Sequence, residues 1–370
     1  MKAHSLVTPL RVLPVMLATV LVAVGQAQDA TPEKLSPQAQ QYRSIYAEYK
    51  AANTAIETEL RMVTGEAKTQ LREKRKRVPY TFAKRVLDIA RQDPSHEDAY
   101  YPLMFCAVEL DSGEHFDAAL VILREHFVDH EFVHQIIPEV VAKDSREIDP
   151  FLRAVAAKGR GKRNQGEARF GLADRLKSRA GRSGDSESVK AAEVALQNVI
   201  ATYPEVAGRG GSLKELAERE LDDLCGPRGI GRVAPEVEGQ DLDGKPFKLS
   251  EYRGKVVVLS FSGHWCGPCR AAHPHHQALI DKYAESPLAL IEVNTDKDRD
   301  AVRRYMHEKN LTWRCFSDES TDGPISKAWG IHSWPRICVI DRKGVIRHKA
   351  IEPVPAELGK WVATLLNETE

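Results

Sequence analysis

The stretch "SGHWCGPCRAAHPHH", residues 262–276, decides the fold of the C-terminal part of this chain. It continues from "KVVVLSFS", residues 255–262, a nearly unbroken run of β-branched and apolar residues. Such a run is typical of a strand buried on both faces. The residues after Cys269 predict a helix to about Tyr283. Cys266 and Cys269 therefore lie where a buried strand passes into a helix.

This position gives the cysteine pair its chemistry. Unpaired N–H groups and the helix dipole at a helix N-terminus favour a thiolate, so we expect one at Cys266. Cys269 lies one turn deeper and can attack a sulfur held on Cys266. Gly267 and Pro268 keep the turn between them tight, because proline is accepted in the first turn of a helix.

Two other uses of the pair are disfavoured by the surrounding residues. Zinc needs four ligands, but His273, His275 and His276 follow along the same helix and cannot complete a tetrahedron with both thiolates. A purely structural bridge that closes so small a loop constrains the unfolded chain very little. The sequence therefore predicts a redox pair without a metal or another cofactor.

The motif "WCGPCR" after a buried strand resembles the active site of thioredoxin-like proteins. The longer stretch "FKLSEYRGKVVVLSFSGHWCGPCR" is similar to the extracytoplasmic TlpA/ResA-type redoxins, which are grouped with the AhpC/TSA family. Pro274 matches that family's helix-kinking proline, and "HSWPRICVID" matches the loop that carries its cis-proline, here Pro335. The resemblance covers about residues 230–368. A looser similarity, in "GPISKAWGIHSWP" and "LDDLCGPRGIG", points to a subgroup with a long helical N-terminal extension.

The resemblance implies a mechanism for this site. Cys266 is expected to attack the disulfide of a protein partner, and Cys269 to resolve the resulting mixed disulfide. Pro335, in cis, is expected to face the cysteines and to hold the backbone of Trp334 ready for an extended substrate. Trp265 is expected either to shield one side of the pair or to serve in ordinary core packing.

Two positions depart from the family pattern. The family often has a buried acid six residues before the first cysteine, where this chain has Ser260, so proton transfer from Cys269 must use water, Ser260 or another acid such as Glu292. The residue after the cis-proline is Arg336 instead of threonine; it can stabilise the thiolate, read an acidic partner or point to solvent.

The Gly-Pro dipeptide between the cysteines resembles that of the reducing members of the family and predicts a potential of about −270 mV. The electron donor is not identified by the sequence.

The composition is that of a soluble globular protein, with 42% hydrophobic and 29% charged residues. Lys plus Arg and Asp plus Glu both number 53, which gives no general attraction to nucleic acid or anionic membranes. Six cysteines are too few for a disulfide scaffold. The four cysteines outside the motif are expected to be small buried hydrophobes: Cys106, Cys225, Cys315 and Cys338. In an oxidising compartment, Cys315 and Cys338 are candidates for a disulfide bridge.

Residues 1–27 read as a signal peptide. Lys2, His4 and Arg11 precede an apolar run over residues 12–25, which is too short to span a bilayer comfortably. Gly25 and Ala27 suit the −3 and −1 positions of a cleavage site. The alternative is an uncleaved anchor, which would be the only attachment to a membrane. We therefore expect a periplasmic or secreted protein.

The region from 28 to 229 predicts an all-α helical domain, and residues 230–370 an α/β thioredoxin fold. Apolar residues recur at helical spacing over 38–73 and 80–92, with a basic run at 72–77 that we expect at a solvated helix end. Seven more helical segments are expected over residues 99–110, 116–127, 132–141, 149–158, 168–180, 189–203 and 213–225. After a Gly/Pro-rich linker, an Asp-Gly turn in "DLDGKPFKL" predicts a hairpin, and alternating β and α elements follow.

Three rival functions remain open. The segment "HEFVH" matches a zinc-protease pattern in which His130 and His134 share a metal and Glu131 acts as base, but Pro138 shortens the helix. A thiol peroxidase normally has proline and threonine or serine at positions that here are Leu259 and Gly263. The third rival is a helical protein-interaction module with a secondary or inactive redoxin domain.

Overall fold

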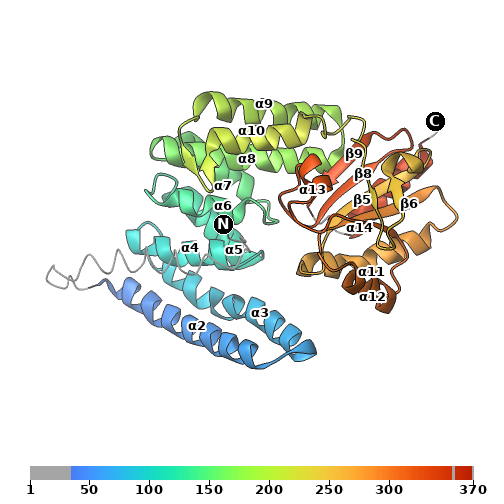
Figure 1. Cartoon of the computed structure of the whole chain (residues 1–370). Helices are drawn as coiled ribbons and strands as arrows, with labels where there is room; N and C mark the ends of the chain where they lie inside the picture. Colours follow the sequence, from blue (N-terminus) through green and yellow to red (C-terminus); the bar gives the residue numbers. More distant parts are fainter. Residues whose placement is uncertain (1–34, 352–354, 369–370) are drawn as a thin grey trace, which may run out of the picture. The chain divides into compact units, whose positions relative to one another are not determined.

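The computed structural model describes residues 35–351 and 355–368 (Figure 1). The predicted signal peptide, residues 1–27, lies outside these described residues. The chain divides into two compact units between Phe127 and Val128, and each unit is described by itself. The predicted domain boundary at 229/230 separates a helical region from an α/β region, and it stays a prediction. Within the described ranges, no helix combines the length and apolar character needed to cross a bilayer.

The described part of the first unit is helical. Its helices are α2 (Pro37–Met62), α3 (Gly65–Ala90), the 3-10 helix η2 (Glu97–Ala99), α4 (Tyr100–Glu109) and α5 (Glu114–His126). The ring of Tyr49 in α2 packs edge-to-face on Phe105 of α4, with ring centroids 4.9 Å apart. The Tyr49 hydroxyl also donates a hydrogen bond to Glu109 at 2.6 Å. Aromatic packing therefore attaches α2 to the rest of this unit.

The predicted single helix over residues 38–73 is wrong. α2 ends at Met62 because Val63 adopts an extended backbone, and α3 starts at Gly65, whose φ is +63°. A positive φ costs glycine little, so Gly65 suits a sharp turn between two helices. The apolar spacing alone does not reveal this break.

The predicted separate helix over residues 80–92 is also wrong, because α3 runs through Pro79 to Ala90. Proline lacks an amide donor and usually weakens a helix interior. Here Pro79 and its neighbour Val78 are both buried, so packing keeps the helix continuous. The basic run 72–77 therefore lies inside α3 and not at a helix end.

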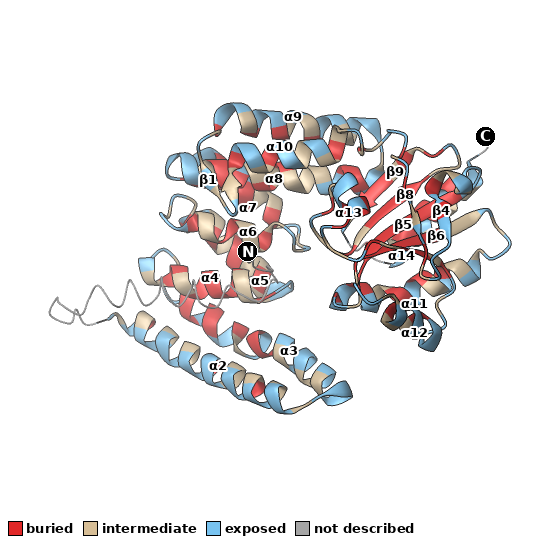
Figure 2. Ribbon diagram, viewed as in Figure 1, coloured by how far each residue is buried: buried red, intermediate tan, exposed pale blue. Residues whose placement is uncertain are grey.

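The second unit begins with a helical part. Its elements are η3 (Val133–Gln135), α6 (Ile137–Val140), α7 (Ile148–Lys158), α8 (Gly161–Ser183), α9 (Ser186–Thr202), the two-residue strands β1 (Ala207–Gly208) and β2 (Gly211–Ser212), and α10 (Leu213–Cys225). Ala173, Leu196 and Leu213 belong to the buried core of α8, α9 and α10, and Figure 2 shows the outer faces of these helices exposed. Ser212 and Glu215 form a capping box that fixes the start of α10.

The C-terminal part of this unit is built on a five-stranded sheet with the order β7-β6-β5-β8-β9. Its strands are β5 (Val256–Ser262), β6 (Leu288–Asn294), β7 (Arg314–Ser317), β8 (Arg336–Ile340) and β9 (Ile346–Ala350). The central strand β5 is buried along its whole length and pairs parallel with β6 and antiparallel with β8. The predicted Asp-Gly hairpin is confirmed as the antiparallel pair β3 (Glu238–Gln240) and β4 (Pro246–Lys248).

The helices that flank this sheet are α11 (Gly267–Lys282), α12 (Arg299–Glu308), α13 (Pro324–Ala328) and α14 (Pro355–Asn367). Alternate residues of a strand face opposite sides. Val256 and Val258 of β5 join the core that α11, α12 and α14 cover, whereas Phe261 faces the other core. Ser260 and Ser262 therefore lie on the face covered by α11.

The helical part packs directly against the edge strand β9. A Cβ atom added to Gly181 of α8 would lie only 2.3 Å from the carbonyl oxygen of Lys349. His348 Nδ1 also lies 2.9 Å from the carbonyl oxygen of Arg182. Glycine at position 181 is therefore what allows α8 to approach the strand.

Candidate active site

The two cysteines of the motif form a disulfide at the beginning of α11. β5 ends at Ser262, and Cys266 is the N-cap residue of the helix. The backbone N–H of Cys269 donates to Cys266 Sγ at 3.2 Å. Pro268 occupies the first turn, where its missing amide proton costs nothing. The chain thus places Cys266 at the positive end of the helix dipole, as the sequence predicts.

The two cysteines differ in their access to solvent. Cys266 is 4% exposed and Cys269 is 1% exposed. Helix N-termini stabilise a thiolate by their unpaired N–H groups and dipole, and this stabilisation acts most directly on the N-cap residue. Cys266 thus caps the helix and is slightly less buried than Cys269.

Two tryptophans lie beside the pair. Trp265 is 50% exposed, which rules out the core-packing alternative for this residue. Its ring centroid lies 5.6 Å from that of Trp334, and its Nε1 donates to Thr295 Oγ1 at 3.1 Å. The Trp334–Pro335 peptide bond is cis, and β8 starts at the next residue. The loop identified by sequence resemblance is thus adjacent to the residue that precedes Cys266.

A buried acid lies on the sheet face under α11. Ser260 of β5 pairs in register with Glu292 of β6, and both residues are 2% exposed. The two carboxylate oxygens of Glu292 accept hydrogen bonds from Asn294 Nδ2 and Trp313 Nε1, each at 3.0 Å. Glu292 is therefore a buried, hydrogen-bonded acid beside the position where the family often carries one.

His273 belongs to the same buried cluster, and sequence reasoning considered it only as a zinc ligand. Its Nε2 lies 3.6 Å from Glu292 Oε2, and its Nδ1 lies 3.1 Å from the hydroxyl of Tyr305. Burial lowers the pKa of His273, and the neighbouring carboxylate of Glu292 opposes this shift. His273 follows Cys269 by one helical turn, and that spacing was the available signal.

Arg336, which follows the cis-proline, is paired within the chain and does not point freely to solvent. Its Nη2 donates to Asp223 Oδ2 of α10 at 2.9 Å. Its side chain is only 14% exposed. The helical part of this unit therefore supplies the partner of a residue in the cis-proline segment, a contact that no local sequence pattern indicates.

The remaining cysteines are free. Cys315 and Cys338 are buried on β7 and β8, which are separated in the sheet by β6 and β5, so the suggested bridge between them is wrong. Cys106 is also buried, and Cys225 is half-buried. Burial raises the pKa of all four thiols, which makes them poor nucleophiles.

The "HEFVH" segment does not form the continuous helix that a zinc-protease site needs. The predicted helix over 132–141 is replaced by η3 and the short helix α6. His134 Nδ1 instead lies 3.0 Å from Asn164 Oδ1 of α8, and burial lowers the pKa of His134. Among the described residues, no group of three or more His, Cys, Asp or Glu side chains is arranged to hold a metal ion.

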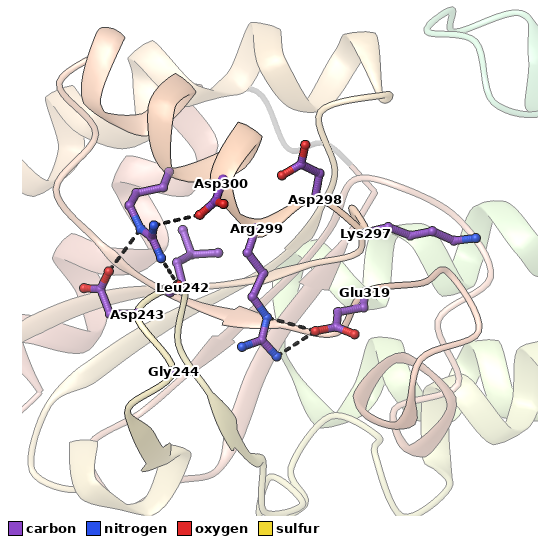
Figure 3. A pocket seen from close by; sticks show the side chains of 9 residues that line it. Leu242, Asp243, Gly244, Lys297, Asp298, Arg299, Asp300 and Glu319 are labelled. Carbon is purple, nitrogen blue, oxygen red and sulfur yellow. Dashed lines mark hydrogen bonds and ion pairs between the residues drawn. The ribbon is translucent and has the colours of Figure 1, made fainter.

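A separate surface pocket lies at the start of α12 (Figure 3). Two of its arginines are already neutralised, since Arg299 pairs with Glu319 at 2.6 Å and Arg303 pairs with Asp243 at 3.1 Å. The residues that line it include neither motif cysteine. This pocket therefore takes no part in chemistry at the cysteine pair.

Comparisons with known proteins show what this chain is similar to. The family profile described as Redoxin matches residues 230–365. Thiol-disulfide oxidoreductase ResA from Bacillus thuringiensis is 32% identical over 131 residues, which cover 35% of this chain and 72% of that protein. Thioredoxin-like protein YneN from Bacillus subtilis is 32% identical over 120 residues, covering 32% of this chain and 68% of that protein. A solved thioredoxin domain of a thiol-disulfide oxidoreductase from Bacteroides vulgatus is 23% identical, covers 37% of this chain and 97% of that chain, and has a TM-score of 0.34.

A cysteine pair at the start of a helix, next to a cis-proline loop on a mixed sheet, defines a thioredoxin-fold redox protein. The helices of the preceding region complete the predicted architecture, an all-α part followed by an α/β thioredoxin fold. The chain belongs to the redoxin family and is a thiol-disulfide oxidoreductase of the ResA type.

Proposed function

We propose that this chain is an extracytoplasmic reductant that exchanges disulfides with protein partners through Cys266 and Cys269. The observation that supports this proposal is the disulfide at the start of α11, in which Cys266 caps the helix and is more exposed than Cys269. In its reduced form this arrangement favours a reactive thiolate at Cys266.

The exchange has two steps. In the first, the Cys266 thiolate attacks one sulfur of the partner disulfide, and the other partner sulfur leaves as a thiolate. In the second, the Cys269 thiol loses its proton, and its sulfur attacks Cys266 Sγ. The second partner thiolate is released, the chain is left with its 266–269 disulfide, and two electrons have passed to the partner.

The partner is expected to bind beside the pair as an extended segment. Trp265 and Trp334 line this place, and Pro335 precedes the strand β8. Backbone groups of the cis-proline loop would pair with the partner chain as an added strand. Gly267 and Pro268 form a small, rigid turn between the cysteines, which leaves room for the partner chain.

The proton of Cys269 needs an acceptor in the second step. Ser260 replaces the usual acid, and the buried cluster of Glu292 and His273 lies on the face of the sheet that α11 covers. Glu292 is therefore our candidate for the acceptor, with His273 linking it to the hydroxyl of Tyr305.

We propose the direction of electron transfer and the cellular location from the sequence. The Gly-Pro dipeptide between the cysteines favours a reductant with a potential of about −270 mV. The apolar segment at 12–25 favours export to the periplasm or outside the cell. An exported reductant needs an external electron donor, which must itself reduce the 266–269 disulfide after each cycle.

Reduction of insulin disulfides tests this proposal. With dithiothreitol as electron source, the wild-type chain should accelerate insulin reduction, whereas Cys266→Ser should lose the acceleration. Cys225→Ser, which changes a half-buried cysteine outside the motif, is the matched control and should retain it. A wild-type chain no faster than Cys266→Ser would favour the interaction-module alternative and refute a catalytic redoxin domain.

A further inference from the structure

The last turn of α10 and the turn that follows it contact both ends of the loop that carries Pro335. Before the loop, Arg228 Nη1 donates to the carbonyl oxygen of Ala328 at 2.9 Å. After the loop, Arg336 Nη2 donates to Asp223 Oδ2 at 2.9 Å. The stretch from 223 to 228 is therefore a two-point support for the loop, although it precedes the part of the chain that the redoxin profile matches.

Asp223 is the centre of this support. Its carboxylate is bound by Lys177 Nζ at 2.6 Å, by Arg336 and by Lys349 Nζ at 2.5 Å. The same Lys349 ammonium donates to the backbone carbonyls of Asp223 at 2.7 Å and Arg228 at 3.0 Å. These contacts join α8, α10 and the strands β8 and β9 at one carboxylate.

The group is sheltered from water. The side chains are 18% exposed in Asp223, 14% in Arg336 and 6% in Lys349. Charges in such surroundings interact strongly, and removing one partner leaves the others poorly solvated. Burial tends to raise the pKa of Asp223, but the three cations outweigh it and hold that pKa far below its usual value. The carboxylate is therefore charged and fixed in position.

The supported loop reaches the cysteine pair within a few residues. Pro335 directly precedes Arg336, and Trp334 packs against Trp265, the residue before Cys266. His332 and Ser333 of the loop line a cleft whose lining also includes Asp223 and Arg336 themselves.

We propose that Asp223 is a positioning residue of the exchange site. By binding Arg336, Asp223 holds the 329–335 loop in the place where a protein disulfide docks. This inference rests on the proposed function. In this proposal, the helical part of the second unit contributes to substrate binding by positioning the loop. It does not require Asp223 to touch the partner or the reacting sulfurs.

The test compares Asp223→Asn, Arg336→Gln and the double variant in the full-length chain. KM for insulin should rise about tenfold in each single variant, with kcat within about twofold of wild type. The double variant should be no worse than either single variant, because both remove the same contact. The reaction of reduced Cys266 with dithiobis(nitrobenzoate), a small disulfide that needs no docked chain, should stay within about twofold.

Two further variants separate positioning from general stability. Glu220 lies on α10 with Asp223, and Glu220→Gln removes its ion pair to Lys177 of α8; this variant should leave the insulin KM within about twofold. Arg336→Lys keeps a cation opposite Asp223 and should restore most of the activity lost in Arg336→Gln. If Asp223→Asn does not fold, the comparison of these two Arg336 variants carries the test alone.

The inference is overturned if KM rises as much in Glu220→Gln, if the two single effects multiply in the double variant, or if the small disulfide slows in parallel. A wild-type chain that fails to reduce insulin would refute the proposed function and this inference together. An active wild type with unchanged Asp223 and Arg336 variants would refute this inference only.

Discussion

Cys266 and Cys269 are joined to each other, yet their surroundings prepare them for different roles. Cys266 caps α11, whereas Cys269 lies in the first turn, and β5 beneath the helix carries a serine in place of an acid. The residues that we propose in place of that acid are Glu292 of β6 and His273, one turn after Cys269 in α11. At this scale the sequence predicted the sulfurs but not how their neighbours are arranged.

Glu292→Gln should slow insulin reduction at pH 7 by at least about tenfold, because the amide cannot accept the proton of Cys269. The deficit should shrink as the pH rises, since the thiol then ionises without help. The measurement is kcat/KM from pH 6 to pH 9. Glu285→Gln, at an exposed position after α11, is the matched control. Equal pH profiles for Glu292→Gln and wild type would exclude Glu292 as the acceptor.

His276 should make the protein less stable in mild acid. Burial lowers its pKa to about 4, helped by His273 and His275, whereas an unfolded histidine titrates near pH 6.5. Between these values the unfolded chain binds more protons, so stability falls as the pH drops from about 6.5 to 4, by up to about 3 kcal/mol.

Urea unfolding at pH 7 and pH 4.5 measures this effect. His276→Leu should reduce the loss of stability between the two pH values, because leucine takes up no proton. His275→Leu changes the exposed neighbour and should keep the wild-type loss. An undiminished loss in His276→Leu would mean that other groups cause the acid sensitivity.

Elements of the C-terminal part were predictable because strong local patterns specify them. The β-branched run of β5, the Asp-Gly hairpin and the Gly-Pro helix start each carry their signal within a few residues. The helices before residue 128 were harder to predict from the sequence. Apolar spacing continues across the turn at Val63, and Pro79 lies inside a helix that tertiary packing keeps intact. Local propensity does not contain that packing.

The approach of α8 to β9 gives a prediction at the level of elements. Gly181→Ala should destabilise the protein by at least about 2 kcal/mol, because the new methyl group would lie 2.3 Å from a backbone carbonyl that cannot move alone. Gly359→Ala in α14, where no atom lies within 4 Å of the new Cβ, should stabilise by up to about 1 kcal/mol. Thermal or urea unfolding compares the two, and equal effects would contradict this close approach.

Contacts between distant parts of the chain determine the behaviour of the whole molecule. The Asp223–Arg336 ion pair joins residues 113 positions apart, and no local pattern in a single sequence indicates such a pairing. A boundary at 229/230, as proposed from sequence, would separate Asp223 from the sheet that it supports. The redoxin profile alone therefore does not include everything that this site depends on.

A chain shortened to residues 230–370 should be less stable than one comprising residues 128–370, because β9 would lose its packing against α8 and Lys349 would lose Asp223 and Arg228 as partners. Urea unfolding of the two chains measures this difference. Equal stabilities would show that the sheet does not depend on α10.

The proposed exchange requires Cys266 to be the sulfur that attacks and Cys269 to be the one that resolves the mixed disulfide. The direct measurement is mass-spectrometric mapping of the mixed disulfide that Cys269→Ser forms with a protein disulfide substrate. We predict a stable adduct joined through Cys266, and no lasting adduct with wild type or Cys266→Ser. An adduct joined through another cysteine, or none at all, would contradict the assignment.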